Sequence, residues 1–157
     1  MERYLTIKKS RNGRGIFAKK DFLKGESLFE VKGKFISGDV DEDIDERTRD
    51  NAFRFDKERY VSPGRGIGNF LNHSCNPNSR VVKIKGRLII AAIKPIRRGD
   101  EVAIDYSTIL AADDIWEMKC NCGAPDCRKV IKRFVSLPKP IKQKYIDQRI
   151  VPKYILG

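Results

Sequence analysis

The short stretch 68–78 concentrates side chains that can bind a ligand. It contains His73, the only histidine of the chain, beside Asn72, Ser74 and Cys75. Asn and His are poor strand formers, and the Asn-Pro-Asn that ends the stretch favours a turn. Polar residues gathered between apolar segments are typical of a site on a loop. A lone histidine and a turn are also common without any function, so the rest of the chain must decide between a functional loop and a plain turn.

The other three cysteines form a local cluster that predicts a metal site. Cys120, Cys122 and Cys127 follow the spacing C-x-C-x4-C. Tetrahedral zinc takes four ligands, so one position is left to Cys75 or His73. The four cysteines of the chain match an all-thiolate site, and His73 is the rival for the fourth place. Because clustered thiols in an intracellular chain favour metal over disulfides, we expect one structural Zn²⁺ that joins the tail to the loop 72–78.

Composition narrows the class of protein. With 157 residues and a hydrophobic fraction of 40%, the sequence predicts one folded domain. No apolar run approaches the length that spans a bilayer, and the N-terminus lacks an apolar signal region, so we expect an intracellular protein without membrane contact. The net charge of +12 indicates an acidic partner or a weak nucleic-acid contact, although a solvated basic surface explains it equally well. The acidic run 39–50 is interpreted either as a segment that binds a cationic substrate or as a solvated loop.

The elements that must position these residues are mostly short strands. We expect strands at 4–8, 27–31, 34–37, 53–56, 59–61, 80–84, 87–93 and 102–106. Lys85-Gly86 predicts a hairpin between two of them. Helical periodicity is weak before residue 109, and one helix is expected between 137 and 150. The sequence therefore predicts a mainly β, β-rich α+β chain. We divide it into a main domain at 1–118, a zinc-binding segment at 119–135 and a basic, helical tail at 136–157.

Four motifs in order resemble those of the SET-domain protein-lysine methyltransferases. The segment 72–78 is similar to the family's Asn-His-Ser-Cys-x-Pro-Asn, and 99–106 is similar to its Gly-Glu-Glu-Leu-x-x-Asp-Tyr. Gly13-Arg14-Gly15 resembles the N-terminal glycine motif, and 120–127 resembles the post-SET C-x-C-x4-C. Together they cover about residues 7 to 131, and a combination of motifs is far more specific than any one of them.

The resemblance implies a fold of small curved sheets with a C-terminal pseudoknot, an exception to the rule against threading. It also implies S-adenosylmethionine as methyl donor, with cofactor and target lysine entering from opposite faces. Carried over by motif, Gly13, Arg14, Gly15, Asn72, His73 and Trp116 would contact the cofactor, and Tyr106 would act at the transferring methyl. The zinc ligands would be Cys75, Cys120, Cys122 and Cys127.

The resemblance implies that the protein transfers a methyl group to the neutral amine of a lysine. That lysine would belong to a histone or another basic, nucleic-acid-binding protein. The location would be nuclear in a eukaryote and cytoplasmic in a prokaryote. Two departures bear on the lysine channel: Phe53 stands where many members have tyrosine, and Ile104 where many have Phe or Tyr, which hints at room for di- or trimethylation. Two rival hypotheses are a zinc-stapled basic module that binds nucleic acid or chromatin protein, and a SET-fold pseudoenzyme without turnover.

Overall fold

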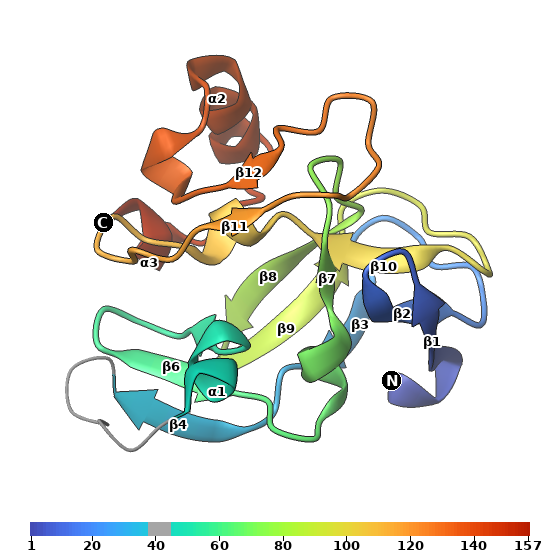
Figure 1. The fold of residues 1–157 in the computed structure, drawn as a ribbon. Coiled ribbons are helices and arrows are strands. Elements are labelled where there is room, and N and C mark those ends of the chain that lie inside the picture. The colour runs from blue at the N-terminus through green and yellow to red at the C-terminus, as the bar shows by residue number, and fades with distance from the viewer. Residues whose placement is uncertain (38–44) are drawn as a thin grey trace.

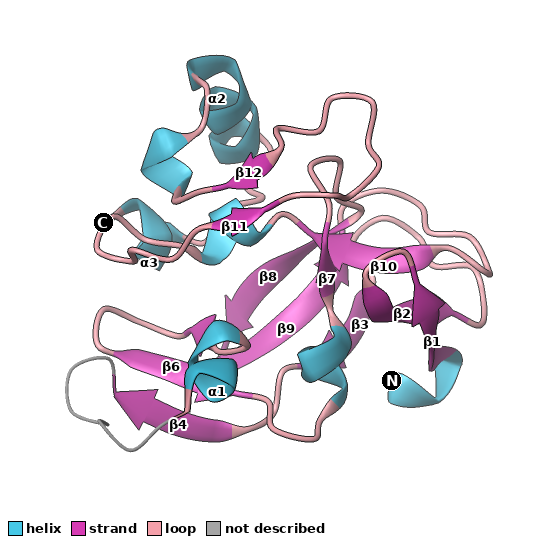
Figure 2. Ribbon diagram, in the orientation of Figure 1, coloured by secondary structure: helices cyan, strands magenta, loops and turns pink. Residues whose placement is uncertain are grey.

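The computed structural model describes residues 1–37 and 45–157, and the chain is mainly β, as the sequence predicts (Figures 1 and 2). The strands are β1 (Leu5–Ser10), β2 (Gly13–Ala18), β3 (Ser27–Glu30), β4 (Lys34–Ser37), β5 (Phe53–Arg54), β6 (Arg59–Ser62), β7 (Asn72–His73), β8 (Ser79–Ile84), β9 (Arg87–Ala92), β10 (Glu101–Ile104), β11 (Met118–Lys119) and β12 (Val130–Ile131). The helices are η1 (Glu2–Tyr4), α1 (Glu46–Asp50), η2 (Ile67–Phe70), η3 (Tyr106–Ile109), η4 (Phe134–Ser136), α2 (Lys139–Asp147) and α3 (Lys153–Leu156). None of the described helices has the length and apolar character needed to cross a membrane.

The strands form small sheets, with the orders β1-β2-β10-β7, β3-β9-β8, β4-β6-β5 and β11-β12. The predicted β8–β9 hairpin is confirmed: Ile84 pairs with Arg87, and Lys85 and Gly86 both have positive φ, as a tight turn between twisted strands requires. In the first sheet β10 lies between β2 and β7, which it pairs in antiparallel and parallel orientation respectively (Figure 1). This sheet therefore brings the start, the middle and the end of the main domain together.

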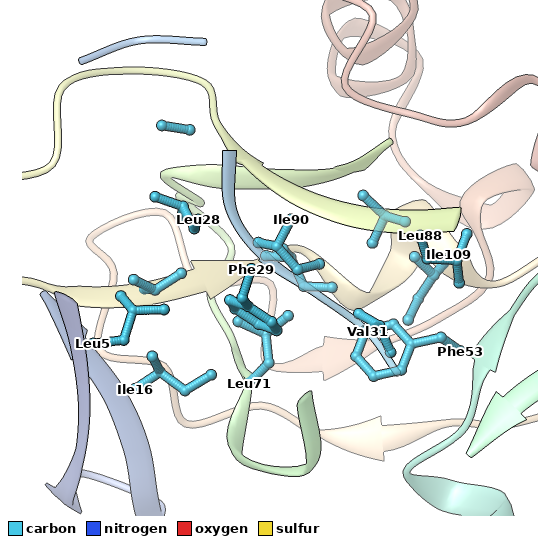
Figure 3. Packing of buried hydrophobic residues seen from close by; sticks show 14 of the residues in the cluster. Leu5, Ile16, Leu28, Phe29, Val31, Phe53, Leu71, Leu88, Ile90 and Ile109 are labelled. Carbon is cyan, nitrogen blue, oxygen red and sulfur yellow. The ribbon is translucent and has the colours of Figure 1, made fainter. Parts of the chain in front are cut away.

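Buried apolar side chains from three of the sheets meet in one core (Figure 3). β9 is buried at every position after its first, because β3 and β8 flank it on both sides. On β3 the neighbours Leu28 and Phe29 are both fully buried, although successive strand residues normally point to opposite faces. A register shift between Ser27 and Phe29 explains this, since a bulge turns one residue inward.

The C-terminal segment adds a second, smaller apolar cluster. Tyr145 of α2 and Ile155 of α3 pack there with Phe134 and Ala111. The predicted C-terminal helix is thus present as α2, which begins just after Pro138. The boundaries of the three predicted segments remain predictions.

Two expectations about single segments need comment. The predicted strand 102–106 is too long: β10 ends at Ile104, and Tyr106 begins the 3-10 helix η3. The reason is the side chain of Asp105, which accepts the backbone N–H of Ser107 and so caps the helix. Most of the acidic run 39–50 lies outside the described residues.

Candidate active site and metal centre

The site forms where β7 and β10 run side by side. Asn72 pairs with Ala103 and His73 with Ile104, and the N–H of Ser74 donates to the carbonyl of Ile104 at 2.9 Å. The loop 72–78 and the segment 99–106 thereby lie in contact. The glycine motif belongs to the neighbouring β2, so three of the four motifs share one sheet.

Glu101 holds the side chain of Asn72 in place. The Nδ2 of Asn72 donates to Glu101 Oε1 at 2.8 Å and to the carbonyl of Arg14 at 2.9 Å, and Ser10 Oγ donates to both carboxylate oxygens of Glu101 at 2.9 Å. Gly15 lies against this group so closely that an added Cβ would be 2.0 Å from Glu101 Oε1. The close approach explains why a residue without a side chain stands there.

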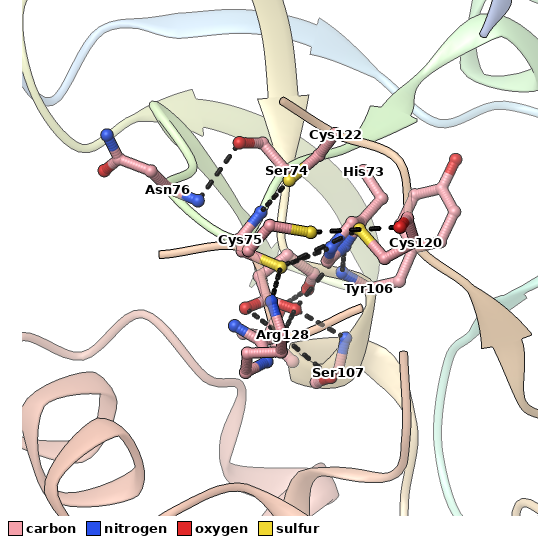
Figure 4. A network of polar contacts seen from close by, with 12 residues as sticks. His73, Ser74, Cys75, Asn76, Tyr106, Ser107, Cys120, Cys122 and Arg128 are labelled. Atoms are coloured by element: carbon pink, nitrogen blue, oxygen red, sulfur yellow. Dashed lines mark hydrogen bonds and ion pairs between the residues drawn. The ribbon is translucent and has the colours of Figure 1, made fainter. Parts of the chain in front are cut away.

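His73 is a neutral ring with an assignable proton. Its Nδ1 accepts the backbone N–H of Tyr106 at 2.9 Å, so the ring proton resides on Nε2, which lies 3.3 Å from Cys75 Sγ (Figure 4). Burial lowers the pKa of His73 to about 4, against the opposing charge of Asp105. The 3.5 Å separation of Nδ1 from Asp105 is therefore not an ion pair, because Nδ1 acts as an acceptor.

Tyr106 has a fixed hydroxyl. Its O–H donates to the carbonyl of Leu71 at 2.5 Å, and its ring makes an edge contact with His73 at 5.3 Å between centroids. Burial, and after it the charge of Glu101, raises the pKa of Tyr106 above its ordinary value. The residue thus remains a neutral hydroxyl at physiological pH, with its donor used and its lone pairs available.

Tyr106 lines two cavities. The first has a volume of about 90 Å³ and includes Phe53, Leu71 and Trp116 in its wall. The second, of about 330 Å³, is lined by the residue before the glycine motif and by residues of the loop 72–78 and the tail: Asn12, Asn72, His73, Met118, Lys119, Cys120, Asn121, Cys122 and Ile131. Tyr106 is the lining residue that these two cavities share.

The cysteines gather beside this second cavity. The Sγ atoms of Cys75, Cys120 and Cys122 and a ring nitrogen of His73 all lie within 4.8 Å of one another. Cys127 is adjacent, with its Sγ 3.8 Å from the carbonyl of Cys120. A hydrogen bond from the N–H of Lys129 lowers the pKa of Cys127 to about 7, whereas burial raises that of Cys75 to about 11.

A buried carboxylate connects the site to the C-terminal helix. Asp105 is fully buried, and Arg128 contacts it at 2.7 Å and Tyr145 of α2 donates to it at 2.8 Å. Figure 4 shows Arg128 between the cysteines and Ser107. Asp105 and Ser107, the residues on either side of Tyr106, are therefore held by hydrogen bonds from the tail.

The structure brings most of the predicted site residues together but places Trp116 apart from them. Asn72, His73, Tyr106 and the glycine turn lie together, whereas Trp116 lines the first cavity, with its Nε1 donating to Asp50 at 3.1 Å. Ile104 is fully buried in the core and is absent from the walls of both cavities. Sequence reasoning did not name as site residues four polar residues whose hydrogen bonds hold the candidate site in place. They are Ser10, Glu101, Arg128 and Tyr145. For Glu101 the signal was its place in the 99–106 motif, and for the others the sequence gives none.

Comparison with known proteins adds the following likenesses. The family model described as "SET domain" matches residues 13–107. The histone-lysine N-methyltransferase trr of Drosophila melanogaster is 35% identical over 129 residues, which are 74% of this chain and 5% of that protein. Histone-lysine N-methyltransferase 2B of Homo sapiens is 34% identical over 76% of this chain and 5% of its own length. The H3 lysine-4 specific histone-lysine N-methyltransferase of Saccharomyces cerevisiae is 30% identical over 73% of this chain and 12% of its own length.

Among solved structures, one of KRYPTONITE in complex with mCHG DNA and SAH matches with a TM-score of 0.64. It is 24% identical and covers 82% of this chain and 29% of that one. The fold is thus shared, while the chain spans only a small part of the length of these curated relatives.

Proposed function

This chain belongs to the SET-domain family, and we propose that it is a protein-lysine N-methyltransferase that uses S-adenosylmethionine. The observation that carries the proposal is the position of Tyr106, which lines two cavities of different character and whose hydroxyl is fixed by the carbonyl of Leu71. An in-line displacement needs two reactants aligned on opposite sides of the transferred group, and holding them so removes much of the entropic barrier. The geometry around Tyr106 suits that task.

The second cavity fits the methyl donor. S-adenosylmethionine supplies an electrophilic methyl group on a positively charged sulfur when it is bound. Asn72 and His73 line the cavity together with Ile131, so amide, imidazole and apolar surfaces are available for the polar and aromatic parts of the molecule. Gly13 leaves the start of β2 open to a close approach, because nothing lies within 4 Å of an added Cβ there, whereas Glu101 and Asn72 fill the space at Gly15. We assign Gly13, Arg14, Gly15, Asn72 and His73 to cofactor binding.

The first cavity fits the substrate lysine. Phe53, Leu71 and Trp116 offer apolar walls for its methylene chain, so we place Trp116 on the lysine side. An amine with an ordinary pKa of ~10.4 must lose its proton before it attacks, and desolvation between such walls lowers its pKa. The neutral Tyr106 accepts no proton at physiological pH, because burial keeps its hydroxyl protonated. Its role is to orient the amine and the methyl group through its lone pairs.

Zinc fits the thiol cluster, and the hydrogen bonds favour Cys127 over His73 as the fourth ligand. A histidine that binds metal through Nε2 carries its proton on Nδ1. The Nδ1 of His73 instead accepts the N–H of Tyr106, so its Nε2 has no lone pair to offer. We propose a structural, tetrahedral Zn²⁺ bound by Cys75, Cys120, Cys122 and Cys127. Such an ion would hold one wall of the second cavity, since Cys120 and Cys122 line it.

Replacing the two candidate fourth ligands separates the alternatives. We expect Cys127→Ser to lose bound zinc during dialysis against a weak chelator, because three ligands hold the ion poorly. His73→Gln should retain one zinc per chain under the same treatment. Elemental analysis of the dialysed proteins measures both. Retention by the Cys127 variant together with loss by the His73 variant would assign the ligand to the histidine instead.

Gly15→Ala tests the group that orients Asn72. The new Cβ would lie 2.0 Å from Glu101 Oε1 and 2.9 Å from Asn72 Nδ2, both at the ends of flexible side chains, so the fold survives while the hydrogen bond between them is displaced. Because a hydrogen bond to a charged group contributes roughly 1.5–3 kcal/mol, we expect its loss to weaken the affinity for S-adenosylmethionine about tenfold or more. Calorimetric titration measures the affinity, and thermal unfolding monitors the fold. The matched control is Gly68→Ala, whose nearest contact is 3.3 Å, and it should bind as the parent does. Equal binding by both variants would refute the role of Glu101.

The relatives suggest the substrate class. The named relatives are histone methyltransferases, so we propose a lysine of a histone or of another basic, chromatin-associated protein as the target and, in a eukaryotic cell, a nuclear location. The test is transfer of labelled methyl from S-adenosylmethionine to histones and to cell-extract proteins. We expect label on lysine. No label on any of these proteins, with the cofactor shown to bind, would favour the pseudoenzyme hypothesis.

A further inference from the structure

A third cavity, of about 450 Å³, lies on the other side of the loop 72–78 and has a strongly basic wall. It is bounded by that loop, by β8 and β9 and by the end of α2. Five of its lining residues are cationic, and we call them the basic cluster: Lys24, Arg80, Lys94, Lys144 and Arg149. Asp126 is the acidic residue in the same wall. The cavity therefore has a marked excess of positive charge, and its wall includes neither Tyr106 nor Asn72.

The basic cluster lacks the carboxylate partners that structural cations usually have. Within residues 1–37 and 45–157, none of the five forms an ion pair. Lys94 contacts only a neutral group, the Oδ1 of Asn76 at 3.3 Å. Burial, and after it the charge of Arg149, lowers the pKa of the half-buried Arg80, the direction expected of a cation without a counterion.

The backbone at Arg149 explains how two guanidinium groups reach the same cavity. The N–H groups of Arg149 and Ile150 donate to the carbonyls of Ile146 and Tyr145, which is the pattern that ends a helix with a left-handed residue. Arg149 occupies that left-handed position with φ of 54°, where glycine is favoured. Its carbonyl accepts a hydrogen bond from Arg80, so the strained turn brings two guanidinium groups to one cavity.

Capping of α2 does not account for the whole cluster. The carboxyl end of a helix carries the equivalent of about half a negative charge, and it favours cations in the last turn. That explains Lys144 and Arg149, which lie at or next to the end of α2. Lys24, Arg80 and Lys94 come from other segments. An anion in the cavity would meet charges from all of these segments at once.

We propose that this cavity binds a phosphate group of a nucleic-acid backbone. Phosphate presents several strong acceptors and a negative charge, and arginine and lysine are the residues that contact it most often. A free phosphate offers the same chemistry, but the net charge of +12 favours a ligand with many phosphates. Such binding goes beyond methyl transfer and does not depend on it, so its test needs no activity.

The experiment measures binding of a fluorescent duplex DNA to the full chain by anisotropy, over a series of salt concentrations. The cavity variant is Lys24→Ala/Lys144→Ala, in which both side chains are exposed and make no hydrogen bond in the described structure. The control Lys8→Ala/Lys19→Ala removes the same charge from exposed sites outside the cavity. We expect the cavity variant to bind more weakly, and its salt slope should fall by about 1 for each phosphate that it no longer neutralises. The control should keep the slope of the parent.

Arg149→Gly separates binding from folding. Glycine suits the left-handed position, so the thermal midpoint should stay equal or rise while DNA binding weakens. Equal losses in the cavity and control variants would overturn the proposal in favour of a diffuse charge effect, and absence of DNA binding would overturn it outright. If inorganic phosphate binds to the cavity, as followed by NMR shifts, and the DNA affinities of all variants agree, the site is a free-phosphate site and the nucleic-acid assignment is wrong.

Discussion

Tyr106→Phe is expected to reduce methyl transfer by roughly two orders of magnitude or more while the chain still binds S-adenosylmethionine. The substitution removes only the hydroxyl that donates to the carbonyl of Leu71, on a residue that lines both cavities. The ring and its edge contact with His73 remain. Because the hydroxyl orients both reactants, its loss should lower the rate of transfer much more than the affinity for either. Transfer of labelled methyl under single-turnover conditions measures the rate, and calorimetric titration measures the affinity.

Folding must be checked in the same variant. The carbonyl of Leu71 loses its partner, which costs about 1–3 kcal/mol if no water replaces the bond. Assays well below the unfolding temperature of the variant remove this effect. Tyr4→Phe is the matched control, since Tyr4 is partly exposed and lines neither cavity. A Tyr106 variant that transfers methyl within a few fold of the parent would exclude the proposed role.

Among the variants proposed for this protein, Asp105→Ala is expected to lower the free energy of unfolding most. The carboxylate is fully buried and binds Arg128 and Tyr145, so its removal leaves a buried guanidinium without a counterion. Breaking such a pair costs about 3–5 kcal/mol, which is a large share of the roughly 5–15 kcal/mol that stabilises a typical domain. Urea unfolding followed by tryptophan fluorescence measures the change in the free energy of unfolding.

Two comparisons make this result specific. Asp21→Ala removes an exposed carboxylate that accepts the N–H of Arg98, and it should cost no more than about 1 kcal/mol. Combining Asp105→Ala with Arg128→Met removes both charges, and part of the stability should return. If the single Asp105 variant were as stable as the Asp21 control, the network would not be a structural anchor.

The sequence predicted the parts of the site that are written as contiguous motifs. Asn72, His73 and the glycine turn were named from their neighbours in the chain, and the structure brings them together on one sheet. The Lys85-Gly86 hairpin was predictable for the same reason, since a two-residue turn has few solutions. Local patterns therefore identified the chemistry and the short-range geometry.

What the sequence could not predict depends on contacts between distant residues. Nothing near Tyr145 indicates that its hydroxyl donates to Asp105, because the pairing requires the packing of α2 against the main domain. Trp116 lines the first cavity, a position that the composition of its loop does not indicate, and its contact with the cofactor stays a prediction. The end of β10 was misplaced because a capping carboxylate, rather than strand propensity, stops the strand.

The position of β10 between β2 and β7 has a consequence for the order of folding. Contacts between residues far apart in sequence form late, because closing the loop between them costs entropy before the contacts add any stabilisation. Both pairings of β10 join remote segments, so Asn72 and Tyr106 meet only when nearly all of the main domain has been made. A chain still emerging from the ribosome at residue 100 would possess the glycine turn and the loop but no working site. The two strands that carry the candidate site can therefore pair only after synthesis has passed Ile104.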